Sequence, residues 1–248
     1  MSDTFTALPE FQVPPASVRL NRPSAGFVDK LQATQQLLQQ AAQELAPITQ
    51  ASSLGAEDVV ITHIVQQLGL EIPAFVLETG RLHKETLQLL ERAQQQVPIK
   101  VYRPDAAAVQ AFVAREGEDA MYRSIALRKA CCQLRKLVPL AQALEGYGAW
   151  VTGLRREQSG ARADVPLVDR SEARVKVNPL ADWTWGDVWH YIAEHQVDYN
   201  PLHDQFFPSI GCAPCTRAIT DGEDFRAGRW WWEDEAAKEC GLHVRQGS

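Results

Sequence analysis

The sequence predicts an α/β fold: a Rossmann-like parallel sheet whose strands are joined by crossover helices. Two observations support this prediction. Short apolar segments typical of strands alternate with longer segments of helical periodicity, as in parallel sheets. A predicted strand also runs directly into a Ser/Gly turn and a helix at residues 48–58. This step places backbone N–H groups and the positive end of a helix where an anion can bind.

The predicted elements follow one another with few gaps. Residues 1–25 hold four prolines and little periodicity, which indicates an irregular arm, and residues 26–46 have the apolar spacing of an amphipathic helix. The remaining prediction, in order, is a strand ending near Ser52, a helix opened by Glu57 and Asp58, strand 73–77, helix 83–96, strand 99–102, helix 105–115, strand 148–152 and a Trp-rich amphipathic helix near 181–196. Ligands of parallel sheets bind beyond the carboxyl ends of the strands. We therefore expect the loops after Leu77 and Thr152 to border a binding site.

Size and charge exclude several classes of protein. The chain has 248 residues and a formal net charge of −6, which suits one large domain with a small appendage and argues against a general nucleic-acid binder. The sequence contains no run of 18 apolar residues, so it predicts no membrane span. The N-terminus lacks the basic and apolar parts of a signal peptide. We expect a cytoplasmic protein whose thiols stay reduced, and a homo-oligomer remains possible.

Four of the five cysteines form two tight pairs. Cys131 and Cys132 are adjacent in ACCQLRK, and Cys212 and Cys215 form a CxxC in GCAPCTR. Thiolates are soft ligands suited to zinc and to iron–sulfur clusters, so the two pairs together predict one metal site. The alternative is four small buried hydrophobic side chains.

The spacing within the pairs bears on the kind of metal. Structural zinc sites usually have two to four residues between the ligands of each half, whereas the side chains of a tandem pair diverge. An iron–sulfur cluster is larger and accepts thiolates from diverging directions. The pattern therefore favours a four-iron, four-sulfur (4Fe-4S) cluster over zinc. A redox disulfide between Cys212 and Cys215 is a third possibility, but it leaves the tandem pair unexplained.

Basic residues surround these motifs. Arg128, Lys129 and Lys136 flank the tandem pair, where cations lower the pKa of thiols and offset the charge of a cluster. Arg155 and Arg156 follow a predicted strand in TGLRREQSGAR, where guanidinium groups suit a phosphate or sulfate. An exposed surface pair is the alternative for these two arginines.

The Ser/Gly turn has the residues of a weak anion site. It contains Ser52, Ser53 and Gly55 but lacks the lysine of a Walker loop and the three glycines of a dinucleotide loop. By itself, a small loop of this kind is usually an ordinary turn. The fifth cysteine, Cys240, lies in the tail segment KECGLH. A position in the tail suits a mobile nucleophile, and an incidental exposed thiol is the alternative.

Together, the tandem Cys-Cys, the distant CxxC and the C-terminal ECGLH resemble the assimilatory adenylyl-sulfate (APS) reductases. These are the cluster-containing branch of the APS/phosphoadenylyl-sulfate (PAPS) reductase family, and the resemblance covers residues 48–243. It implies an adenine-nucleotide alpha-hydrolase-like fold with a C-terminal redox tail. The resulting prediction divides the chain into an N-terminal arm (1–25), a nucleotide- and cluster-binding domain (26–220) and a segment that carries the catalytic cysteine (221–248).

The resemblance also implies roles for individual residues. Cys131, Cys132, Cys212 and Cys215 are expected to hold the 4Fe-4S cluster, and Cys240 to be the catalytic nucleophile, with His243 nearby. LETG resembles the family's LDTG segment, with glutamate in place of aspartate, and is expected near the adenosine. The residues expected to bind substrate are Ser52, Ser53, Gly55, Glu78, Thr79, Gly80, Lys136, Arg155, Arg156, Arg226, Arg229 and His243.

The implied reaction is the reduction of adenylyl sulfate to sulfite and AMP, in sulfate assimilation and cysteine biosynthesis. Cys240 would form an S-sulfocysteine, and thioredoxin (or glutaredoxin) would supply the electrons. Two alternatives remain. One is a reductase of the 3′-phosphorylated nucleotide, or one of dual specificity. The other is a non-catalytic nucleotide-binding module with structural zinc, or a cluster-bearing RNA-thiolation relative.

Overall fold

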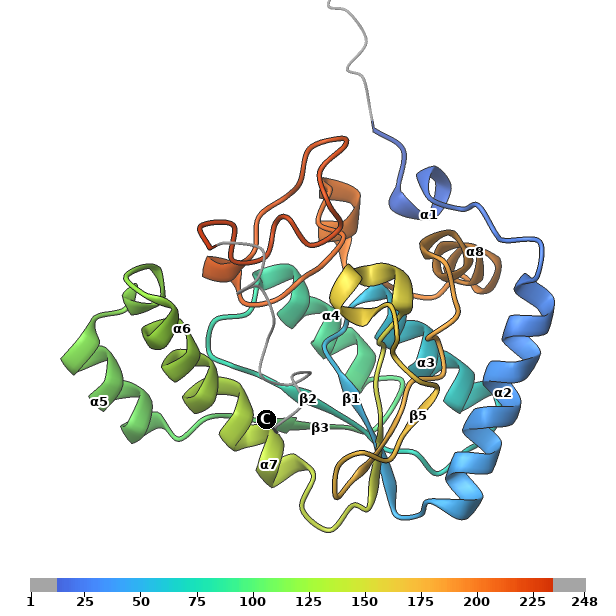
Figure 1. Cartoon of the computed structure of the whole chain (residues 1–248), viewed down its shortest axis with the longest axis horizontal. Helices are drawn as coiled ribbons and strands as arrows, with labels where there is room; N and C mark the ends of the chain where they lie inside the picture. The colour runs from blue at the N-terminus through green and yellow to red at the C-terminus, as the bar shows by residue number, and fades with distance from the viewer. Residues whose placement is uncertain (1–12, 234–248) are drawn as a thin grey trace, which may run out of the picture.

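A six-stranded sheet forms the centre of the computed structural model, which describes residues 13–233 (Figure 1). The strand order is β3-β2-β1-β4-β6-β5, and all neighbours are parallel except β5 and β6. The strands are β1 Ile48–Ser52, β2 Ala74–Leu77, β3 Ile99–Tyr102, β4 Ala149–Val151, β5 Val168–Asp169 and β6 Val175–Val177. The predicted α/β fold is therefore confirmed. Strands β5 and β6 were not predicted.

The α-helices of the described residues are α1 Ala16–Arg19, α2 Phe27–Glu44, α3 Ala56–Gln67, α4 Lys84–Gln94, α5 Ala106–Glu116, α6 Ile125–Cys132, α7 Val138–Ala143 and α8 Trp185–His195. Of these, α2, α3, α4, α5 and α8 occupy positions that periodicity predicts. Short 3₁₀ turns are η1 Ala120–Tyr122, η3 Arg156–Gln158, η4 Gly160–Arg162, η5 Pro201–Gln205 and η6 Ala213–Cys215, and η2 Gln133–Leu137 is π-helical. No helix within residues 13–233 is long and apolar enough to cross a membrane.

Helices cover both faces of the sheet. Along β2, Ala74 and Val76 belong to the main core with buried residues of α2, α3, α4 and α8, whereas Phe75 packs into a second core with Ala143 of α7 and with Trp150. The alternation follows from the two-residue period of a strand. Because both faces are buried, the carboxyl ends of the strands are the part of the sheet left to form a ligand site.

A wide turn interrupts the long helix that carries the tandem cysteines. Helix α6 ends at Cys132, and the π-helical segment η2 leads into α7. Pro139, in the first turn of α7, has no N–H to donate to the carbonyl of Arg135, and its ring would clash with that carbonyl in a regular α-helix. A π-turn relieves the conflict. It lies directly after the cysteine pair and carries both Arg135 and Lys136.

The segment before α2, predicted as an irregular arm, contains α1, which packs against α8. Asp187 of α8 joins the two regions, since its carboxylate accepts hydrogen bonds from the Ser24 backbone N–H (2.7 Å) and from Lys30 Nζ (2.9 Å). At the other end of the described chain, the orange-to-red segment after α8 lies over the carboxyl ends of β1 and β2 (Figure 1). The domain boundaries at residues 25 and 220 stay a prediction.

Candidate active site

A pocket of about 210 Å³ opens at the carboxyl edge of the sheet. Its floor is formed by the ends of three strands, with Ser52 of β1, Val76 and Leu77 of β2, and Thr152 just after β4. Its other walls come from residues 208–211 and from Phe225, Arg226 and Arg229. Segments far apart in the sequence thus meet where parallel sheets usually bind ligands.

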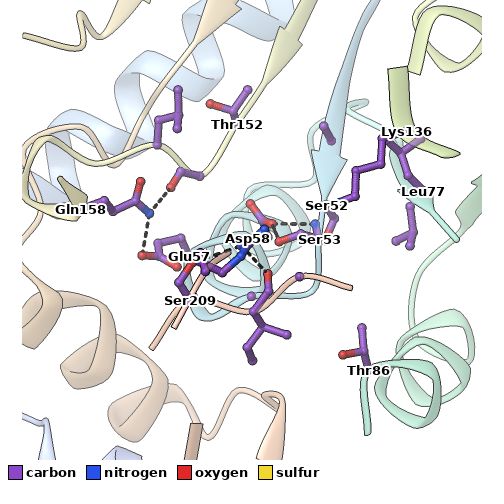
Figure 2. A pocket seen from close by; sticks show the side chains of 18 of the residues that line it. Ser52, Ser53, Glu57, Asp58, Leu77, Thr86, Lys136, Thr152, Gln158 and Ser209 are labelled. Atoms are coloured by element: carbon purple, nitrogen blue, oxygen red, sulfur yellow. Dashed lines mark hydrogen bonds between the residues drawn. The ribbon is translucent and has the colours of Figure 1, made fainter. Parts of the chain in front are cut away.

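The turn after β1 borders the pocket. Ser52, Ser53 and Gly55 all line the pocket, and Leu54 between them adopts a left-handed conformation (φ 60°). The backbone N–H and hydroxyl of Ser53 both donate to the carboxylate of Asp58, at 2.6 and 2.7 Å (Figure 2). The predicted turn is present, and Asp58 takes up the two Ser53 donors.

Asp58 is a buried acid in the pocket wall. Burial raises its pKa from 3.8 to about 6; neighbouring Glu57 adds to the rise, and the hydrogen bonds from Ser53 oppose it. Gly153 leaves room for this carboxylate, because a Cβ at Gly153 would lie 2.5 Å from Asp58 Oδ1. Close approach of backbone to side chain therefore requires glycine at position 153.

We expect Asp58 to make the fold less stable as the pH rises. Its folded-state pKa lies above the unfolded value, so its contribution is most favourable below about pH 4 and is lost as the pH rises through 6, by about 3 kcal/mol. Urea unfolding of wild type and Asp58→Asn at pH 4 and pH 7 measures it. Wild type should lose stability relative to the variant over this range. The exposed Asp29→Asn is the control, and an equal pH dependence of wild type and Asp58→Asn would contradict the assignment.

Cationic side chains reach the pocket from three segments: Lys136 from η2, Arg162 from η4, and Arg226 and Arg229 from the segment after η6. Arg226 and Arg229 are each 7% exposed. The Nη1 of Arg229 donates to Ser209 Oγ and to the carbonyl of Ile210, both at 3.2 Å. Such a group of cations suits a ligand with more than one negative charge.

Arg155 and Arg156 do not line the pocket, which corrects the prediction that they contact the substrate. Arg155 is fully buried; its Nε donates to Glu57 at 2.9 Å and its Nη1 to Glu157 at 2.8 Å. The side chain of Arg156 is directed to Asp182 and to the carbonyl of Val165. Carboxylates of the fold, rather than a ligand, neutralise both arginines. Arg155 acts on the pocket through Glu57, which does line it.

The LETG loop is also only partly at the pocket. Thr79 lines it, whereas Glu78 and Gly80 do not. The carboxylate of Glu78 accepts from the Gly80 backbone N–H (2.7 Å) and from Arg103 Nε (3.2 Å). Glu78 therefore shapes its own loop. The hydroxyl of Thr79 lies 3.3 Å from Cys212 Sγ and connects this loop to the cysteines.

The four paired cysteines line one small cavity beside the pocket. Cys131 and Cys132 come from the end of α6, and Cys212 and Cys215 flank η6. The cavity is also lined by Arg81, Met121, Arg128, Arg135, Lys136, Pro214, Arg229 and Trp230. Lys136 and Arg229 line both this cavity and the pocket. The two sites therefore share a cationic wall.

The chemistry of this cavity fits a thiolate-ligated metal cluster. Burial raises the pKa of Cys215 to about 12; Cys212 adds to the rise, and Lys136 opposes it. Metal ligation requires deprotonated thiols, and the surrounding arginines and Lys136 offset their charge. Within residues 13–233, no three His, Cys, Asp or Glu side chains converge closely enough for one metal ion, and no disulfide forms.

Comparison with known proteins agrees with this arrangement. Residues 47–218 match the family model described as the phosphoadenosine phosphosulfate reductase domain. The chain belongs to this reductase family. The matched region begins just before β1 and extends beyond Cys215, so it includes the pocket floor and all four paired cysteines. The resemblance predicted from the cysteine motifs is confirmed.

Relatives within the reductase family are similar over most of their length. A protein named adenosine 5′-phosphosulfate reductase from Allochromatium vinosum is 53% identical, over 85% of this chain and 84% of its own. One of the same name from Burkholderia cepacia is 50% identical, over 89% and 88%. A third, from Neisseria meningitidis serogroup A, is 44% identical, over 94% and 96%.

Solved structures support the fold of the family. A phosphoadenylyl-sulfate reductase from Candida auris superposes with a TM-score of 0.64 at 22% identity, over 80% of this chain and 98% of its own. A Candida glabrata FMN adenylyltransferase reaches 0.56 at 13% identity, over 90% and 83%. This reductase-family chain therefore shares its overall α/β fold with these structures.

Sequence reasoning missed several pocket residues. Gln158 donates to Glu57 (2.9 Å) and to the carbonyl of Gly153 (3.2 Å), which braces the acidic wall (Figure 2). His203 also lines the pocket, and its Nδ1 donates to the carbonyl of Phe207 at 2.7 Å. Burial lowers the pKa of His203 to about 4, so it is neutral at pH 7. A single glutamine or histidine outside any motif does not indicate from the sequence that it lines a pocket.

Two predicted residues of this reductase-family chain, Cys240 and His243, lie outside the described residues 13–233. Their roles stay predictions. The described chain ends at Glu233, seven positions before Cys240.

Proposed function

We propose that the protein is an adenylyl-sulfate (adenosine 5′-phosphosulfate) reductase, a sulfur-group oxidoreductase of sulfate assimilation and cysteine biosynthesis. The observation that carries the proposal is the cationic wall, Lys136 and Arg229, between the pocket and the four-thiol cavity. A nucleotide with an anionic phosphosulfate suits a pocket with such a wall. The names of relatives that are 44–53% identical support the same activity.

The residues at the pocket suggest how the substrate lies. Lys136, Arg226 and Arg229 bind the phosphosulfate, and the turn at Ser52 and Ser53 lies beside it. The apolar pocket residues Phe75, Leu77 and Trp150 suit the adenosine, in agreement with the prediction for the LETG loop. Arg162 adds a fourth cation that the sequence did not single out.

The cofactor in this proposal is a 4Fe-4S cluster held by Cys131, Cys132, Cys212 and Cys215. When bound, the cluster would hold the cysteine-bearing segments in a fixed arrangement beside the substrate, while the electrons come from an external thiol donor. Lys136, on the shared wall, interacts with both the thiolate ligands and the phosphosulfate. The buried guanidinium groups of Arg128 and Arg135 balance the charge of the thiolates.

The reaction proceeds by covalent catalysis at a thiolate. Cys240 Sγ attacks the sulfate sulfur, a sulfur–sulfur bond forms, and the sulfur–oxygen bond to AMP breaks with its electron pair leaving on AMP. A dithiol donor then attacks Cys240 Sγ and releases sulfite. Its second thiol displaces Cys240, so the donor ends as a disulfide and provides the two electrons. Thioredoxin or glutaredoxin is the donor in this scheme, which places the protein in the reducing cytoplasm.

Sulfite release from two nucleotides tests the function. Protein purified without oxygen, and containing about four iron and four acid-labile sulfide per chain, is given adenylyl sulfate or its 3′-phosphorylated form with reduced thioredoxin. We expect kcat/KM to be higher for adenylyl sulfate by at least about 100-fold, or roughly 2.7 kcal/mol. Equal or reversed values would instead assign the dual-specificity or PAPS reductase, and sulfite from neither would contradict the proposal.

A further inference from the structure

The last residue of the described chain is held by a buried ion pair. The carboxylate of Glu233 accepts two parallel hydrogen bonds from Arg128 of α6, Nε to Oε1 at 3.0 Å and Nη2 to Oε2 at 2.7 Å. The side chains of Arg128 and Glu233 are only 1% and 3% exposed. A buried bidentate ion pair fixes both the position and the orientation of its two side chains.

A nearby pair of the same chemistry shows the difference. Arg217 and Glu223 also form two bonds, Nη1 to Oε2 at 2.9 Å and Nη2 to Oε1 at 2.6 Å, but their side chains are 37% and 29% exposed. Exposed pairs contribute little because water competes with them. The Arg217–Glu223 pair joins two residues of one loop, just before Arg226. The Arg128–Glu233 pair instead joins segments that are 105 residues apart in the sequence.

Arg128 also connects the cysteine cavity with the pocket arginines. It lines the cavity, and its guanidinium lies 4.7 Å from the ring centre of Trp230. Arg229 lies 4.8 Å and Arg226 6.0 Å from the same ring. The backbone N–H of Trp230 donates to the carbonyl of Cys215 (3.2 Å), and the carbonyl of Trp230 accepts from the backbone N–H of Glu233 (2.8 Å). The chain from Trp230 to Glu233 is therefore attached to both the cavity and the pocket.

We propose that Arg128 and Glu233 are positioning residues that anchor the base of the C-terminal segment to the cysteine-bearing helix. The inference rests on the proposed function. Cys240 lies seven positions after Glu233, and seven residue steps span at most about 25 Å. Anchoring at Glu233 confines the thiol to a volume around the pocket, which raises its effective concentration at the bound sulfate.

Single-turnover kinetics of the full-length, anaerobically purified protein tests this role. AMP release from adenylyl sulfate without a thiol donor reports attack by Cys240, and calorimetry with AMP reports nucleotide binding. Glu233→Gln is expected to slow AMP release about 10- to 100-fold while the Kd for AMP stays within about threefold. Glu233→Asp keeps the carboxylate charge but has a shorter side chain, so its rate of AMP release should lie between those of wild type and Glu233→Gln. The matched control Glu223→Gln should release AMP at the wild-type rate.

The alternatives give different results. Wild-type AMP release in a folded Glu233→Gln variant would overturn the inference. If Glu233→Gln lost AMP binding and iron content along with AMP release, the inference would also be overturned, because the Arg128–Glu233 pair would then only stabilise the fold. If Glu233→Gln does not fold, Glu233→Asp and Arg128→Lys take its place with the same criterion. Failure of the wild-type protein itself to release AMP would instead overturn the proposed function, and the inference with it.

Discussion

Replacement of Cys240 by serine is expected to abolish sulfite production while leaving nucleotide binding nearly intact. The hydroxyl of serine is a far weaker nucleophile than a thiolate, and loss of a covalent nucleophile costs at least about 10⁴-fold in kcat. The pocket is built from residues 51–229, so AMP and adenylyl sulfate should bind the variant with Kd values within about threefold of wild type. Sulfite release and calorimetry on the same preparation measure the two effects.

Serine replacement at a paired cysteine separates this result from general damage. Cys212→Ser changes a residue that lines the four-thiol cavity, so it should lower iron content together with activity. Cys240→Ser should retain the iron content of wild type. Turnover by Cys240→Ser at more than a few per cent of wild type would exclude Cys240 as the nucleophile.

Replacement of Arg155 by methionine is expected to have the largest effect on folding. Arg155 is fully buried, and Glu57, whose side chain is 10% exposed, would lose the partner of its carboxylate. Breaking a buried pair by removing one member costs about 3–5 kcal/mol. Urea unfolding at pH 7 should therefore show a large decrease in the free energy of unfolding.

The neighbouring arginine provides the control. The side chain of Arg156 is 39% exposed and that of its partner Asp182 is 47% exposed, so Arg156→Gln should cost less than about 1 kcal/mol. Equal decreases in the free energy of unfolding for Arg155→Met and Arg156→Gln would contradict the assignment of Arg155 to a buried ion pair with Glu57. Nucleotide binding by folded Arg156→Gln should match wild type, because Arg156 does not line the pocket.

This contrast between Arg155 and Arg156 marks the limit of sequence reasoning. The two residues are adjacent and chemically identical, and both looked suited to an anion. Arg155 lies in extended backbone (φ −127°, ψ 146°), where successive side chains point in opposite directions. Arg155 therefore meets Glu57, a residue 98 positions earlier, and only the tertiary fold reveals that partner.

The fold was more accessible than the site. Periodicity located β1 to β4 and the helices α3, α4 and α5 between them. Strand β5 has only two residues, too few to show a pattern, and β6 has three, as β4 does, but was not recognised. The π-turn at Gln133–Leu137 depends on Pro139 acting on a carbonyl one turn earlier, a conflict that a hydrophobic pattern does not record.

The cysteines were predictable because their spacing carries the chemistry. Two pairs 80 residues apart predicted a common site, and the structure places all four around one cavity. Their cationic surroundings were only partly visible. Lys136 stood out beside the tandem pair, whereas Arg81 and Arg229 reach the same cavity from distant segments.

The covalent intermediate is the most direct test of the account. Anaerobically purified wild-type protein is mixed with adenylyl sulfate in the absence of any thiol donor, and AMP and peptide masses are measured. The account predicts about one AMP per chain and the added mass of one sulfite group on the peptide that contains Cys240, removed by reduced thioredoxin with release of sulfite. AMP without a modified cysteine, or sulfite attached to Cys131, Cys132, Cys212 or Cys215 instead, would contradict it.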